Sequence, residues 1–112
     1  MFRNFTKCET KEMDYSDEHI KLARFAKALG HPARVKIMEI LANQSCCYSG
    51  DIFEELPIAR STLSQHLKEL KDSGLIQGEI KPPKIKYCVN TENWSSAKKL
   101  IEKFFIERKI NG

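Results

Sequence analysis

Residues 51–86 read DIFEELPIARSTLSQHLKELKDSGLIQGEIKPPKIK, and this stretch predicts two short helices joined by a tight turn and followed by a two-stranded hairpin. Leu63, Leu67 and Leu70 recur at steps of four and three, which places them on one side of a helix. The pattern predicts that this helix runs from about residue 60 to residue 73.

A shorter helix is predicted immediately upstream. Its apolar side consists of Ile52, Phe53 and Leu56, and Pro57 makes the break that separates it from the next helix. Two helices with this spacing are typical of a helix-turn-helix.

The outer face of the second helix is polar and short-chained. At about 100° per residue, Ser61, Gln65 and Lys68 point away from the leucines, and Thr62 and Ser64 flank them. Hydroxyl and amide groups can bind base edges in a major groove, whereas a merely solvated helix face is usually richer in Glu and Lys. The face therefore predicts contact with DNA, the alternative being a polar face that only keeps the fold soluble.

The period of the apolar residues changes after the second helix. Gly74 is expected to end this helix, because a glycine readily adopts the left-handed conformation found at helix C-termini. From Ile76 to Val89 apolar and polar residues alternate on either side of Pro82-Pro83, which predicts a hairpin. The tip and outer face of the hairpin carry Lys81, Lys84 and Lys86, so that a basic hairpin lies beside the polar helix, as in a winged helix.

Two helices are predicted before this unit. Residues 1–15 show no sustained period and are expected to be a flexible arm, followed by one domain over residues 16–110. Ser16 is the predicted N-cap of the first helix and Gly30 its end. Pro32 then starts the second helix, because the missing N–H of proline costs nothing at that position.

Thr91 is expected to cap a last helix that reaches about residue 110. Its apolar stripe is longer than one small domain can cover, so this helix and the first are predicted to pack against their copies in a symmetric dimer. The predicted interface residues are Leu22, Phe25, Leu29, Trp94, Ala97, Ile101, Phe104 and Phe105.

Three segments together resemble the ArsR/SmtB family of small bacterial transcriptional repressors. They are LGHPARVKIMEIL at residues 29–41, STLSQHLKELKDSGLI at residues 61–76 and KYCVN at residues 86–90. The resemblance implies a mainly α fold with a small β-hairpin wing in the order α-α-α-α-β-β-α, with the first and last helices at a dimer interface.

With this resemblance, the expected partner is double-stranded DNA, and a two-fold dimer predicts a palindromic operator. The residues expected to contact it are Arg60, Ser61, Thr62, Ser64, Gln65, His66, Lys68, Lys81, Lys84 and Lys86. Pro82-Pro83 departs from the glycine-containing wing tip of the family. Arg34, at a position where the family carries an arginine, is expected to form an ion pair at the edge of the core, with a phosphate contact as the alternative.

Composition excludes other classes of protein. The net charge is +4, and residues 60–86 hold six Lys and Arg against three acids, which suits a surface that faces phosphates but also fits any solvated face. The sequence contains no apolar run of about 20 residues and no secretory leader, so we expect a cytoplasmic protein without a membrane partner. It contains no phosphate loop, HExxH or nucleophile elbow, so we expect no enzyme.

The four cysteines leave the effector open. In a reducing compartment they are expected to be thiols or metal ligands before they are disulfides. Cys47 with Cys46, or with Cys8 from a partner's arm, could bind a soft ion such as As(III) or Cd(II), although Ser49 stands where the resemblance implies a second thiolate. Cys88 is remote from them in sequence. A metal site, thiol redox sensing and inert thiols all remain possible, and no cofactor is required.

The sequence thus predicts a homodimeric repressor that binds an inverted-repeat operator. One alternative is a repressor that responds to a metal or metalloid through Cys46 and Cys47. Another, from a different class, is a winged-helix module that binds protein and not DNA.

Overall fold

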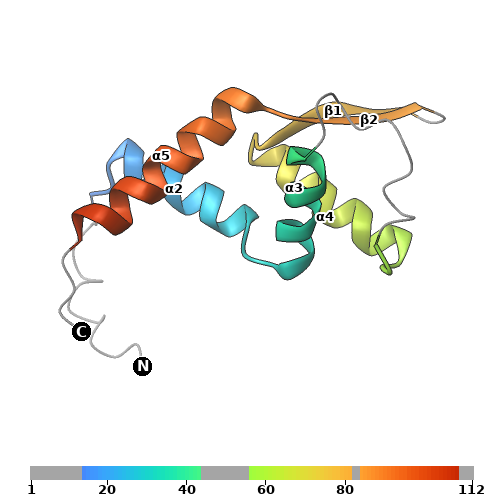
Figure 1. Ribbon diagram of the computed structural model, residues 1–112, viewed down its shortest axis with the longest axis horizontal. Helices are drawn as coiled ribbons and strands as arrows, with labels where there is room; N and C mark the ends of the chain where they lie inside the picture. The colour runs from blue at the N-terminus through green and yellow to red at the C-terminus, as the bar shows by residue number, and fades with distance from the viewer. Residues whose placement is uncertain (1–13, 44–55, 82–83, 109–112) are drawn as a thin grey trace.

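A computed structural model describes residues 14–43, 56–81 and 84–108 of the chain (Figure 1). The described elements are α2 (Asp17–Ala28), α3 (Pro32–Ala42), α4 (Arg60–Asp72), β1 (Ile76–Lys81), β2 (Lys84–Val89) and α5 (Thr91–Glu107). The mainly helical fold with one hairpin confirms the predicted fold class. The helix predicted around Ile52 and Phe53, and residues 1–13 of the predicted arm, lie outside the described residues.

The local signals place the first two helices correctly. Ser16 caps α2 by accepting a hydrogen bond from the His19 backbone N–H at 3.1 Å, and the His19 ring accepts one in return from the Ser16 N–H. The helix ends at Ala28, two residues before the expected stop at Gly30. Pro32 occupies the first position of α3, and the side chain of His31 caps that helix.

The core lies between α3, α4 and the base of the hairpin, which contact one another (Figure 1). Helix α3 contributes Ile37, Met38 and Leu41 to this core, and the segment after α4 contributes Leu75 and Ile76. Burial of each such side chain stabilises the fold by about 1.5–3 kcal/mol. The hairpin and the helix beside it therefore share one apolar support.

The wing is an antiparallel pair, β1 and β2, whose register runs from Ile76↔Val89 to Lys81↔Lys84. Gly74 has φ +88° at the end of α4, the left-handed conformation that the sequence predicts there. Gly78 is needed for a different reason, because a Cβ atom at this position would collide with the carbonyl oxygen of Lys86 on the opposite strand.

Helix α5 begins differently from the prediction. Asn90, and not Thr91, is the N-cap, and its side-chain oxygen accepts a hydrogen bond from the Asn93 N–H at 3.0 Å. Both residue types cap helices well, and β2 ends at Val89, so the first residue after the strand takes the cap position. The helix ends at Glu107, and residues 109–110 of its predicted extension lie outside the described part.

Helix α5 lies beside α2 (Figure 1), and the Nζ of Lys103 binds both carboxylate oxygens of Glu18 at 3.1 Å. Within the described ranges, no helix is both long enough and apolar enough to cross a bilayer.

Candidate nucleic-acid interface

Helix α4 has one buried side and one exposed side. Leu63, His66, Leu67 and Leu70 are buried against the core. The predicted base-reading residues are all exposed: Ser61, Thr62, Ser64, Gln65 and Lys68. The described structure thus presents hydroxyl, amide and ammonium groups on the exposed side of a helix whose opposite side is packed against the core.

The first turn of α4 suits a polyanion. No acidic residue lies in this turn, and Ala59 at the N-cap has no side chain that could bind the free backbone N–H groups. The N-terminal end of the helix dipole is positive, and Arg60 and Ser61 lie there on the exposed side. This end of the helix would attract a phosphate and would not repel it.

Lys68 is exposed but already has an ionic partner. Its Nζ lies 2.9 Å from Oδ2 of Asp72, one turn further along α4. The hydrogen bond to Asp72 raises the pKa of Lys68, and the same bond lowers the pKa of Asp72. A phosphate contact by Lys68 would therefore have to compete with this carboxylate.

His66 is the one predicted DNA-binding residue, among those whose side chains are described, that is not on the exposed face. It is only 8% exposed, because it is three residues after Leu63 and four before Leu70 on the same side of the helix. The Nη1 of Arg34 lies 3.2 Å from its Nδ1, and the His31 ring packs against it with centroids 4.3 Å apart. Burial is the largest cause that lowers the pKa of His66, and His31 and Arg34 lower it further.

Among the residues that the structure describes, Arg34 has no carboxylate partner, contrary to the ion pair that was expected. In the described structure its guanidinium donates from Nε to the Ala28 carbonyl at 2.6 Å and from Nη2 to the Lys27 carbonyl at 3.2 Å. The last carbonyls of a helix have no intrahelical partner, so a guanidinium satisfies them directly. The expectation of a carboxylate partner was wrong for this reason.

The structure describes the side chain of only one of the three predicted wing lysines. Lys86 is exposed on β2. Lys81 and Lys84 pair in the backbone register at the end of the hairpin, and their side chains lie outside the described part of the structure.

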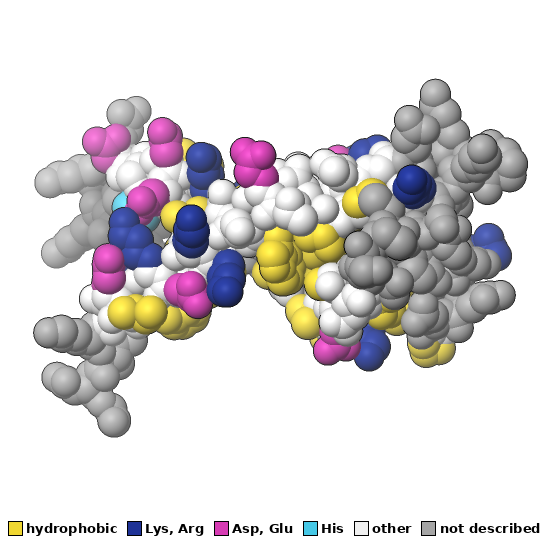
Figure 2. Space-filling view, turned by 45° about the horizontal axis from the view of Figure 1, so that its top comes forward, with side chains coloured by type: hydrophobic (Ala, Val, Ile, Leu, Met, Phe, Trp, Pro, Cys, Tyr) yellow, Lys and Arg dark blue, Asp and Glu magenta, His cyan; other side chains and the backbone are white. Residues whose placement is uncertain are grey.

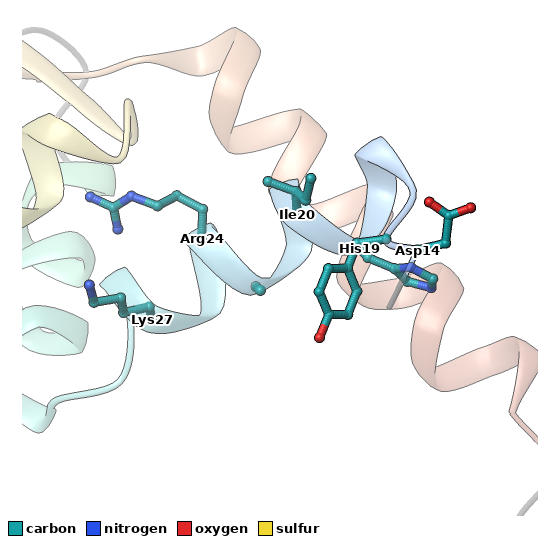
Figure 3. A pocket seen from close by; sticks show the side chains of 7 residues that line it. Asp14, His19, Ile20, Arg24 and Lys27 are labelled. Carbon is teal, nitrogen blue, oxygen red and sulfur yellow. The ribbon is translucent and has the colours of Figure 1, made fainter. Parts of the chain in front are cut away.

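Two contacts that hold α4 had no signal in the sequence. Nη1 of Arg24 on α2 lies 2.8 Å from Oε2 of Glu69 on α4, and Figure 3 shows Arg24 extending from α2 toward that part of the molecule. Asn93 of α5 donates its amide to the Gly74 carbonyl at 2.9 Å. Both join residues distant in sequence, where helical periodicity gives no information.

The predicted dimer residues fall into two groups. Phe25 and Ala97 are buried in the subunit's own core, so a partner would contact little of them. Trp94, Phe104 and Phe105 are 36%, 43% and 71% exposed. The remaining three, Leu22, Leu29 and Ile101, are half-buried.

Hydrophobic surface extends beyond these residues. Figure 2 shows hydrophobic side chains reaching the surface at the end of the molecule that holds α2 and α5, among charged side chains. Ile20 and Tyr15 border a hollow of about 760 Å³ along α2 (Figure 3), and a second hollow of about 230 Å³ lies against Leu29, Trp94 and Ile101. This end of the molecule exposes much apolar area for a chain of this size.

The predicted metal ligands Cys46, Cys47 and Cys8 lie outside the described residues. Among the residues that are described, no group of three or more His, Cys, Asp and Glu could hold a metal ion. Cys88 is disulfide-bonded, which corrects, for this residue, the expectation of a thiol or a metal ligand.

Comparison with known proteins supports the fold and the family. The ArsR-like transcriptional regulator from Rhodococcus sp. RHA1 superposes with a TM-score of 0.65 at 22% identity, over 82% of this chain and 86% of that one. At this identity the match establishes the fold alone.

Two sequence relatives are transcriptional regulators and not enzymes, as the absence of catalytic motifs predicts. HTH-type transcriptional regulator CmtR of Mycobacterium tuberculosis (strain ATCC 25618 / H37Rv) is 32% identical over 68 residues, or 61% of this chain and 57% of CmtR. The match thus spans little more than half the length of CmtR. HTH-type transcriptional regulator YgaV of Escherichia coli (strain K12) is 30% identical over 70 residues, or 62% of this chain and 71% of YgaV.

A family model agrees with these relatives. The model described as "Bacterial regulatory protein, arsR family" matches residues 31–77, from the N-cap of α3 to the start of the wing. The chain belongs to the ArsR family of bacterial regulatory proteins.

Proposed function

We propose that this protein is a cytoplasmic transcriptional repressor that binds an inverted-repeat DNA operator as a homodimer. The observation that supports this most directly is the exposed face of α4. Ser61, Thr62, Ser64 and Gln65 are all exposed there, while the leucines of the same helix are buried.

The chemistry of this face fits a major groove. Gln65 can form paired hydrogen bonds with adenine N6 and N7, and the hydroxyls of Ser61 and Ser64 can donate to or accept from several bases. The wing lysines and Arg60 would bind phosphates, which fixes the register on the duplex without reading sequence. Affinity should therefore fall steeply as salt increases.

A dimer would present two such helices. The exposed Phe104, Phe105 and Trp94 of α5 and the apolar hollow along α2 offer a surface for a second copy. A two-fold dimer places its reading helices about 34–36 Å apart, one turn of the duplex. Two matching half-sites at that spacing form an inverted repeat.

The test is duplex binding by fluorescence anisotropy. The probe is any palindromic segment found upstream of the protein's own gene, and the controls are the same duplex with one half-site scrambled and a random duplex of the same composition. We expect tighter binding to the palindrome, by about 10³-fold or more over a random duplex. Equal affinity for all duplexes, or a monomer at micromolar concentration in sedimentation, would contradict the proposal.

A second candidate function adds an effector. CmtR of M. tuberculosis, whose solved structure matches at 27% identity and a TM-score of 0.51 over 81% of this chain and 91% of that one, is described as a cadmium metal-sensor. We propose that, once the disulfide of Cys88 is reduced, Cys47 with Cys46, or with Cys8 from a partner's arm, binds As(III) or Cd(II) as thiolates. Titration of the reduced protein with Cd(II), followed by thiolate-to-metal absorbance in the ultraviolet, tests this. No absorbance change in the native protein, or an unchanged one in Cys46→Ser and Cys47→Ser, would rule it out.

The remaining alternative is a winged-helix module that binds protein. This alternative predicts no salt-dependent binding to any duplex. Anisotropy measurements repeated at increasing salt concentration therefore distinguish it from the repressor.

A further inference from the structure

Helix α4 is connected to α2 through one arginine of α3. Arg34 donates to the Ala28 carbonyl at 2.6 Å and to the Lys27 carbonyl at 3.2 Å, and its Nη1 reaches Nδ1 of His66 on α4 at 3.2 Å. One planar guanidinium thus contacts the C-terminal end of one helix and the buried side of another. The pair Arg24 and Glu69 joins the same two helices one turn further along.

The contact with His66 fixes the protonation of its ring. A guanidinium can only donate, so Nδ1 of His66 must accept and the proton of the neutral ring must lie on Nε2. A protonated His66 carries a proton on Nδ1 and faces the positive charge of Arg34. Protonation therefore replaces a hydrogen bond with a repulsion.

The described groups that surround His66 do not compensate for a positive charge on its ring. His31, at the N-cap of α3, packs against its ring, and the Nδ1 of His31 is already used to accept from the Ala33 N–H at 3.0 Å. Glu69, the acid three residues further along α4, is bound to Arg24. Desolvation, the strongest effect on the pKa of His66, lowers it in the same direction.

We infer that Arg34 is a positioning residue for DNA binding: with His66 unprotonated, it holds α4 at a fixed orientation relative to α2. This inference rests on the proposed function, since it assumes that α4 reads DNA and that α2 lies at the dimer interface. The spacing of the two reading helices in a dimer then depends on this contact, although neither Arg34 nor His66 touches a base.

The test compares two variants that each remove one positive charge from α3. Arg34→Met removes the bridge, and Lys36→Met removes a charge whose ion pair, with Glu39 at 3.0 Å, stays within the helix. We expect Arg34→Met to weaken operator affinity about tenfold, the size of a typical coupling between sites, and Lys36→Met to change it less than twofold. Equal effects of the two variants would overturn the inference.

A pH series provides a readout that a merely structural role would not change. We expect wild-type affinity for the operator to decline on acidification below pH 6.5. His66→Asn keeps a neutral acceptor near the position of Nδ1, so it should retain affinity at pH 7.5 and lose this decline. If the wild-type decline persists in His66→Asn, His66 is not the group responsible and the inference fails. The pH series with His66→Asn also tests the inference if Arg34→Met does not fold.

Nuclear magnetic resonance on the DNA-free protein separates this inference from the proposed function. The ¹⁵N shifts of His66 should report an unprotonated Nδ1 in wild type and in Lys36→Met, and a changed tautomer balance in Arg34→Met. A protonated Nδ1 in wild type at pH 7.5 would overturn the inference even if the protein binds its operator. Failure of wild type to bind any duplex would overturn only the proposed function.

Discussion

Helices α4 and α5 differ in how much of their apolar surface the subunit covers. Helix α4 buries four of its 13 residues, and α5 buries one of its 17. Helix α4 packs against its own chain and turns a polar face outward, while α5 leaves Phe104, Phe105 and Ile106 exposed. The difference shows that α4 is packed within its own chain, and the exposed apolar side of α5 fits the proposal that a second copy covers it.

The largest expected effect comes from the buried side of α4. Leu67→Ala should lower the free energy of unfolding by about 3 kcal/mol, because Leu67 is only 2% exposed and the change leaves a cavity. Urea denaturation followed by circular dichroism measures this. A loss below about 1 kcal/mol would mean that α4 is less firmly supported than its burial indicates.

The second prediction concerns α5. Phe105→Ser should raise the dimer dissociation constant about 30-fold, corresponding to about 2 kcal/mol for an interface anchor, because Phe105 is 71% exposed in the subunit. Sedimentation equilibrium measures the constant. Val35→Ser, which removes a 53% exposed apolar side chain from α3, is the matched control and should leave the constant unchanged. A dimer insensitive to Phe105→Ser would place the interface elsewhere.

The third prediction concerns the polar face of α4. Gln65→Ala should weaken operator affinity about tenfold, within the 1–3 kcal/mol of a paired contact with a base, and leave the melting temperature unchanged because Gln65 is exposed. Anisotropy with the operator and with a random duplex measures the change in specificity. An equal loss on both duplexes would reassign Gln65 to a phosphate.

The smallest effect is a pH dependence of stability. The pKa of His66 is lowered from 6.5 in the folded chain, so the unfolded chain binds more protons in the window below pH 6.5. Stability should therefore fall as pH decreases from 6.5 toward the folded pKa, and level off below it. Urea titrations between pH 5 and 8 should show a shallower decline in His66→Asn. The same decline in both proteins would assign it to other groups.

Periodicity predicted what depends on local pattern. The leucine spacing located α4, Gly74 marked its end, and the alternation after Ile76 located the wing. The contacts of Arg24 and Arg34 could not be predicted, because each joins helices whose relative orientation is set by the packed core. The N-cap of α5 was misplaced by one residue: Asn is the better N-cap residue of the two, and Asn90 is also the first residue after the end of β2.

In the candidate site, too, local pattern predicted some features and tertiary packing decided others. Pattern alone placed Ser61, Thr62, Ser64 and Gln65 on the exposed side of α4, where the structure has them. It also assigned His66 to DNA contact, although helical geometry puts this residue on the same side as the leucines. The burial of His66 follows from the leucine spacing, but its contact with Arg34 depends on how α3 packs against α4.

The separation of the two sides of α4 has a practical consequence for engineering. Because Leu63, Leu67 and Leu70 supply the support, the four positions Ser61, Thr62, Ser64 and Gln65 can be randomised together with little cost in folding. A library at these positions, selected against new promoter sequences, should yield regulators with altered targets from an unaltered scaffold. The same freedom would let the target drift during evolution while the scaffold stays constant.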